Sequence, residues 1–66
     1  HAGGQLHVYR SDWMKVKWPY RPRDSDELRL EENALVHVLA RDASGWYLGE
    51  VNGHVGLFPA IFAEEI

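Results

Sequence analysis

The chain contains no cysteine among its 66 residues, and this absence limits its possible folds more than any other feature. Disulfides and thiolate metal sites are excluded. The four histidines lack the close Cys/His spacing of a zinc knuckle, so we expect neither a metal nor a cofactor. Ordering such a chain costs on the order of 100 kcal/mol. One compact hydrophobic core, too small to divide into two domains, must therefore offset this cost.

Charge and length argue against several classes of function. The net charge is −3, whereas nucleic-acid binding favours a basic patch. No apolar run approaches the 18 residues of a membrane span. A chain this short provides few walls for a catalytic cleft, no serine has a base at a signature spacing, and no phosphate-binding glycine loop is present. We therefore expect a binding domain rather than an enzyme. The lack of cysteine and of a signal-peptide pattern favours the cytoplasm.

From residue 15 onward the pattern is typical of β-structure. Short alternating or apolar segments recur at 16–20, 28–30, 34–40, 46–51 and 54–58. Asn52-Gly53 is a strong hairpin signal, because a type I′ turn needs positive φ at both central positions. Asn33 is a second candidate for positive φ. About five short strands separated by turns predict a small all-β barrel or sandwich.

The first residues differ from the remainder of the chain. We expect residues 1–14 to form an extension or linker, either disordered or packed on the domain, and residues 15–66 to form the domain itself. Trp13 is a large apolar side chain in a polar setting, so it should find a partner surface.

Three ordered motifs resemble those of an SH3 domain. Residues 20–30 (YRPRDSDELRL) are similar to the family's aromatic start and acidic RT loop, here residues 23–27. Residues 44–49 (SGWYLG) resemble its Gly-Trp-Trp-x-Gly, and residues 56–66 (GLFPAIFAEEI) resemble its Gly-Leu-Phe-Pro ending. The resemblance covers residues 15–66. It implies a five-stranded barrel of two orthogonal antiparallel sheets, with a short 3-10 turn near Pro59–Phe62.

The resemblance also implies a groove for proline-rich (PxxP) segments with flanking Arg or Lys. The groove residues carried over from the family are Trp18, Tyr20, Trp46, Pro59, Ile61 and Phe62. The specificity pocket would pair Trp46 with Asp24, Asp26 and Glu27, which can receive the ligand cation. A polyproline II helix is already stiff, so docking it between aromatic rings costs little entropy. Such a module would be a monomeric part of a larger signalling, scaffold or trafficking protein.

The expected core is mostly aliphatic, because several aromatic residues are assigned to the groove. It comprises Val16, Leu28, Leu30, Val36, Val38, Val51, Phe58 and Ala63. His37 lies between two valines on a predicted strand and should point outward. Glu31 and Glu32 are better explained as solvated surface than as ligand contacts.

Departures from the family pattern leave alternatives open. Ile61 stands where the family usually has Asn, Phe62 where it has Tyr, and Trp18 where it has the first Tyr. The groove would keep its aromatic walls but lose polar anchors, which predicts weaker or atypical PxxP binding. Phe at position 62 resembles the ubiquitin-binding SH3 domains, so ubiquitin is an alternative partner.

Two further alternatives concern the same aromatic surface. The groove could be filled by residues 1–14, with Trp13 or Tyr9 as the plug. A Tudor-like cage for methyl-lysine is the other, since Trp18, Tyr20, Trp46 and an acid could surround a cation.

Overall fold

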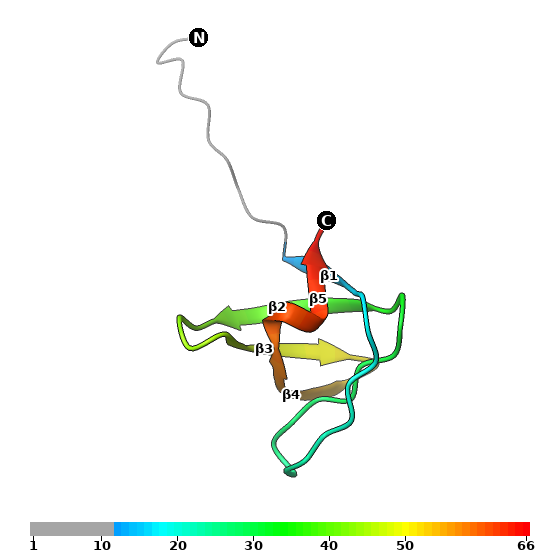
Figure 1. Ribbon diagram of the computed structural model, residues 1–66. Helices are drawn as coiled ribbons and strands as arrows, with labels where there is room; N and C mark the ends of the chain where they lie inside the picture. The colour runs from blue at the N-terminus through cyan, green and yellow to red at the C-terminus, as the bar shows by residue number, and fades with distance from the viewer. Residues whose placement is uncertain (1–11) are drawn as a thin grey trace, which may run out of the picture.

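The computed structural model describes residues 12–66, so the prediction for Tyr9 lies outside the described residues. Five short strands form one antiparallel sheet in the order β4-β3-β2-β1-β5 (Figure 1). The strands are β1 (Trp13–Val16), β2 (Leu35–Arg41), β3 (Trp46–Val51), β4 (His54–Pro59) and β5 (Ala63–Glu65). A 3-10 helix, η2 (Ala60–Phe62), precedes β5, as the sequence predicts. Within residues 12–66, no helix is long and apolar enough to span a membrane.

The sheet bends strongly, so that β5 runs across the direction of β2 and β3 in Figure 1. The RT loop lies alongside β4 and covers the side that the bent sheet leaves open. The N–H of Leu57 donates to the carbonyl of Asp26 at 2.8 Å, and the N–H of Leu28 donates to the carbonyl of Leu57 at 2.7 Å. The expected all-β, SH3-like architecture is therefore confirmed.

Turn chemistry follows the sequence closely. Asn52 and Gly53 have φ values of 52° and 84°, the pair that a type I′ hairpin turn requires. Asn33 has φ 70° and its N–H donates to the carbonyl of Val16 at 2.9 Å. The Asn52-Gly53 turn sets the antiparallel register of β3 with β4. The turn at Asn33 joins the segment that follows the RT loop to β2.

The core lies inside the bent sheet and is almost wholly aliphatic around Phe58. Its buried members are Met14, Val16, Leu28, Leu30, Val36, Val38, Phe58 and Ala63. Every predicted core residue is buried except Val51, which is half-buried and packs against the cluster. Met14 was not predicted, because the sequence pattern assigned it to the extension rather than to a strand.

The first strand lies earlier than the alternation of apolar residues suggests. Val16, Trp18 and Tyr20 predict a strand, but β1 ends at Val16 and Trp18 lies in a bend. Pro19 has no N–H to donate to a ladder. Tyr20 pairs only with Leu30, as an isolated bridge in place of the expected strand over 28–30. The bend turns the rings of this segment toward the surface.

The outer face of β1 and β2 carries an aromatic stack. The rings of Trp13 and His37 lie 4.8 Å apart at 24°. Nδ1 of His37 is 3.7 Å from Oε1 of Glu50 on β3. His37 is half-buried between the buried Val36 and Val38, so its ring lies on the outer face, as the alternation predicts.

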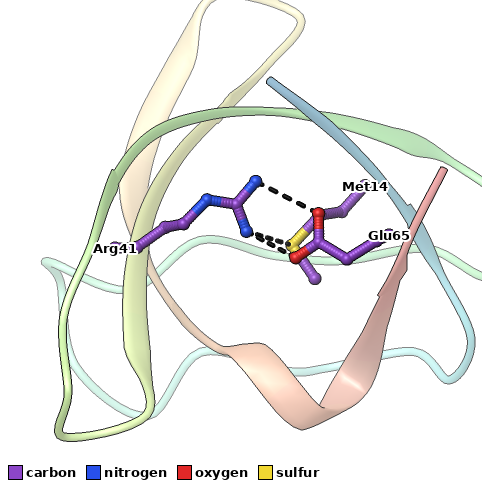
Figure 2. A network of polar contacts seen from close by, with 3 residues as sticks. All are labelled: Met14, Arg41 and Glu65. Atoms are coloured by element: carbon purple, nitrogen blue, oxygen red, sulfur yellow. Dashed lines mark hydrogen bonds and ion pairs between the residues drawn. The ribbon is translucent and has the colours of Figure 1, made fainter. Parts of the chain in front are cut away.

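Arg41 ties the end of β2 to β5 and β1 (Figure 2). Its guanidinium donates to both carboxylate oxygens of Glu65, at 2.5 and 3.1 Å, and its Nη1 lies 4.0 Å from Sδ of Met14. The guanidinium also sits 5.3 Å from the ring centre of Tyr47. The last strand is thus held by side chains as well as by its backbone pairing with β1.

Candidate functional site

Four aromatic side chains meet on the surface formed by the bend after β1, the start of β3 and η2. Tyr20 lies at the centre: its ring is 5.2 Å from that of Phe62 and 6.2 Å from that of Trp46. The Trp18 ring stands 6.1 Å from Phe62 at 90°. All three contacts are edge-to-face, the arrangement that aromatic quadrupoles favour. Trp18 is 54% exposed and Trp46 37%, so both side chains keep area that a ligand can contact.

Backbone contacts fix the positions of these rings. Trp46 pairs with Pro59 across β3 and β4, and the N–H of Ala60 donates to the carbonyl of Gly45 at 2.8 Å. The carbonyl of Phe62 accepts the N–H of Lys17 at 2.8 Å. η2 is therefore held from both sides, and Phe62 packs between Trp18 and Tyr20. The surface formed by Trp18, Tyr20, Trp46, Pro59 and Phe62 is called the aromatic groove below.

Ile61 points away from the packed interior. It is 71% exposed, the largest value among the exposed large apolar side chains. A side chain of this kind on η2 offers a ligand apolar area but no hydrogen-bond donor. The position therefore presents apolar area on η2, next in the chain to Phe62 of the aromatic groove.

The acidic residues of the RT loop converge beside Tyr20. Asp24, Asp26 and Glu27 each place a carboxylate oxygen within 4.8 Å of the others. Asp24 and Asp26 are exposed, whereas Glu27 is half-buried. Oε1 of Glu27 accepts the hydroxyl of Tyr20 at 2.5 Å and the N–H of Arg23 at 2.8 Å. One carboxylate therefore joins the acidic loop to the aromatic groove.

These hydrogen bonds shift the pKa values of both Glu27 and Tyr20. The N–H of Arg23, and then the hydroxyl of Tyr20, hold the pKa of Glu27 below its usual range. The same bond to Glu27 raises the pKa of Tyr20. Glu27 is therefore ionised and Tyr20 protonated at neutral pH, the states in which the bond between them is strongest.

The structure brings the predicted aromatic residues and Pro59 together, and Tyr20 joins them to the predicted carboxylates through Glu27. The predicted pairing of Trp46 with the carboxylates, and a place for Ile61 in the groove, stay predictions. The sequence pattern did not indicate the role of Glu27 as an internal acceptor. It also did not indicate that Nζ of Lys17 lies 4.7 Å from the ring centre of Trp18, a cation–π contact. The Lys17–Trp18 adjacency gives no signal of this contact, because neighbouring side chains on a regular strand point to opposite faces.

The match to the variant SH3 domain family covers residues 16–64, and the chain belongs to this family. That assignment excludes the Tudor-like alternative. SH3 domains are non-catalytic interaction modules.

Individual curated relatives are larger proteins. Mouse CD2-associated protein is 33% identical over 61 residues, which cover 89% of this chain and 10% of that protein. Rat mitogen-activated protein kinase kinase kinase 11 is 46% identical over 58 residues, which cover 80% of this chain and 7% of that protein. The chain thus spans about a tenth of the length of such relatives.

Solved structures agree with the family. The C-terminal SH3 domain of myosin IB from Entamoeba histolytica, bound to a peptide of EhFP10(GEF), has a TM-score of 0.81 at 29% identity. That match covers 89% of this chain and 88% of the other. The Acanthamoeba myosin I SH3 domain bound to Acan125 has a TM-score of 0.80 at 31% identity, over 88% of this chain and all of the other (100%).

Proposed function

We propose that the domain binds proline-rich segments that carry an Arg or Lys beside the PxxP core. The observation that carries this proposal is the Tyr20–Glu27 hydrogen bond of 2.5 Å, which holds an aromatic groove against three converging carboxylates. Proline rings fit between flat aromatic faces, and a neighbouring cation fits the acidic loop. The two solved relatives bound to a peptide and to Acan125 support this reading.

The groove is preorganised for a stiff ligand. Its rings are held by edge-to-face contacts of 5.2 to 6.2 Å, so few rotamers remain to be ordered on binding. A polyproline II helix likewise loses little conformational freedom. Affinity then depends mainly on the apolar area that Trp18, Trp46 and Ile61 expose to the ligand.

The ligand cation should be held chiefly by Asp24 and Asp26. Oε1 of Glu27 already accepts two hydrogen bonds, and moving this carboxylate would break its contact with Tyr20. Asp24 and Asp26 are exposed and free of that constraint. The pair can therefore turn toward an arriving guanidinium without disturbing the aromatic groove.

The groove offers few polar anchors for ligand carbonyls. Ile61 and Phe62 carry no side-chain donor, and the hydroxyl of Tyr20 is directed to Glu27. Two missing hydrogen bonds amount to about 1–3 kcal/mol. We therefore expect proline-rich peptides to bind about 5- to 150-fold more weakly than to a groove with both anchors.

A titration with a basic PxxP peptide tests the proposal. Shifts of the Trp46 indole and of the residue 24–27 amides should report binding. The double variant D24N/D26N should lose at least about tenfold in affinity, because charge-assisted hydrogen bonds are worth about 1.5–3 kcal/mol. E64Q is the matched control: it removes a charge from β5, where Glu64 pairs with Lys15. Equal losses in both variants, or an unchanged affinity in the double variant, would contradict the role given to the RT loop.

Ubiquitin is the second candidate partner, favoured by Phe62 next to the 71% exposed Ile61. A folded partner can use this apolar area without proline rings. Saturation by ubiquitin with little response to the peptide would replace the first proposal. F62Y separates the two: a restored hydroxyl should tighten peptide binding and weaken ubiquitin binding.

The setting of the domain is also part of the proposal. The module begins with β1 at Trp13, two residues before the predicted boundary, because Met14 is part of the core. It acts as a monomer joined through the preceding residues to a larger cytoplasmic signalling, scaffold or trafficking protein. Sedimentation of the chain with and without residues 1–11 tests the monomeric state. Trp13 stacks on His37 and not in the groove, so the prediction that it plugs the groove is wrong. If residues 1–11 occupied the groove, their removal would increase affinity for the peptide.

A further inference from the structure

β4 is an edge strand of the sheet, and only part of its outer edge is covered. At Leu57 both outward groups are paired, with the carbonyl of Asp26 and the N–H of Leu28. Beyond this point the RT loop leaves the edge. Gly56 is buried against the backbone of the RT loop, so the uncovered part of the edge is His54 and Val55.

The ladder geometry fixes where the backbone groups of Val55 point. In an antiparallel pair, residues whose N–H and C=O face the partner strand alternate with residues whose groups face away. Leu57 faces away from β3, so Val55, two residues earlier, also faces away. Among the hydrogen bonds of residues 12–66, none joins the N–H or C=O of Val55 to a group outside β3. Val55 thus presents a donor and an acceptor to solvent.

A hollow of about 470 Å³ lies beside this edge, between the RT-loop arm and the β3–β4 hairpin. Its apolar lining comes from Pro22, Leu28, Val51 and Val55, the last being 59% exposed. Pro22, Ser25, Glu27 and Leu28 form its RT-loop side. None of the aromatic-groove residues lines it, but Glu27, which accepts the hydroxyl of Tyr20, borders both the hollow and the groove.

The charges around the hollow favour a basic partner. Nε of Arg29 donates to Oε2 of Glu31 at 2.9 Å, so these two lining charges offset each other. Glu27 then leaves the lining acidic, and Glu50 stands directly across the ladder from Val55. A second copy of the chain, itself at −3, would bring like charges to the same edge.

We propose that the open edge of β4 at Val55 accepts an extended, proline-free segment of a partner protein as an added strand. The segment pairs its backbone with Val55, places one aliphatic side chain in the hollow and carries Lys or Arg at alternate positions. Backbone pairing supplies affinity, and the hollow and the acids supply selectivity. Proline is excluded at the paired position, because it lacks the N–H that the carbonyl of Val55 would accept. This ligand is therefore distinct from that of the aromatic groove.

The test uses the full 66-residue chain, made by chemical synthesis, and the hexapeptide probe acetyl-(Lys-Val)3-amide. The probe should shift the Val55 amide, slow its hydrogen exchange at least tenfold and leave the Trp46 indole unmoved. Saturating the groove with a PxxP peptide should leave the affinity of the probe unchanged. Failure of PxxP binding would therefore not affect this proposal.

The matched control is a chain with N-methylvaline at position 55. It keeps the side chain and the pairing with β3 but lacks the outward N–H, and should bind the probe at least tenfold more weakly. The charge-reversed probe acetyl-(Glu-Val)3-amide should not bind.

If the N-methylated chain does not fold, the hydrogen exchange of the Val55 amide in the unmodified chain, with and without the probe, tests the proposal instead. Equal binding by both chains or both probes, or a shift at Trp46 in place of Val55, would overturn the proposal. Concentration-dependent protection of Val55 without any probe would identify a second copy as the occupant and overturn it as well.

Discussion

Replacing Gly56 by Ala should detach the RT loop from β4. A Cβ at this position would lie 2.9 Å from the carbonyl carbon of Glu27, 2.9 Å from the nitrogen of Leu28 and 3.1 Å from the carbonyl oxygen of Asp26. All three are backbone atoms, so no rotamer change relieves the contact. The loop must move, and the hydrogen bonds of 2.8 and 2.7 Å that join it to Leu57 must lengthen or break.

The expected destabilisation follows from these contacts. Two hydrogen bonds account for about 2 kcal/mol, and overpacking adds about 1–3 kcal/mol. Ala in a strand recovers about 0.5–1 kcal/mol relative to Gly. The net loss in the free energy of unfolding is then about 2–4 kcal/mol. A chain of this size has roughly 3–10 kcal/mol in total, so the Tm should fall by roughly 10–25 °C.

Thermal unfolding by circular dichroism and titration with the PxxP peptide measure the two consequences. The matched control is G49A on the paired strand, where Cβ would meet side-chain carbons of Val36 and Phe58 at 2.6 and 2.7 Å. G49A should also lower the Tm, but it leaves the RT loop in place. Peptide affinity at a temperature where both variants are folded should therefore fall only in G56A. A wild-type Tm for G56A, or equal affinities in the two variants, would refute this reasoning.

Three other substitutions test different parts of the structure. E27Q should make the free energy of unfolding depend less on pH in acid. Because the pKa of Glu27 is lowered in the folded protein, its contribution to stability is present above the unfolded pKa and is lost as pH falls through the folded pKa. Urea unfolding midpoints between pH 2 and 6 would record the difference. An unchanged acid limb would show that the bonds to Tyr20 and Arg23 do not contribute. N33A should lower stability by about 1 kcal/mol, because φ is 70° there, while N33G should not; equal effects would remove positive φ as the cause. F58A should cost about 3–5 kcal/mol, since Phe58 is fully buried, and should lower the Tm measured by circular dichroism; retention of the wild-type Tm would contradict its central place in the core.

Much of the fold could be predicted because its signals are local. The Asn52-Gly53 turn, the positive φ of Asn33 and the alternation along β2 each depend on neighbouring residues. β1 could not be placed in this way. Its apolar alternation continues past Val16, but Pro19 and the acceptance of the Lys17 N–H by the carbonyl of Phe62 end the strand. That carbonyl is 45 residues away in the chain, so no local pattern contains it.

The candidate site was predictable in composition but not in its internal bonding. Motif resemblance selects Tyr20 and Glu27 as separate members of a groove and a pocket. Only the folded loop shows that the hydroxyl of one donates to the carboxylate of the other. The open edge of β4 has no sequence signal at all, because it depends on where the RT loop leaves the strand.

The pairing of β1 with β5 has a mechanical consequence. Met14, near the start of β1, lies opposite Glu65, near the end of β5 (Figure 1). A force applied through these two neighbouring ends therefore acts across the strands and loads the hydrogen bonds at that end of the ladder first. Antiparallel hydrogen bonds loaded in this way break one after another rather than all together. The Arg41–Glu65 ion pair sits where that unzipping would begin. The domain should therefore yield at low force, with this ion pair as the first contact to resist.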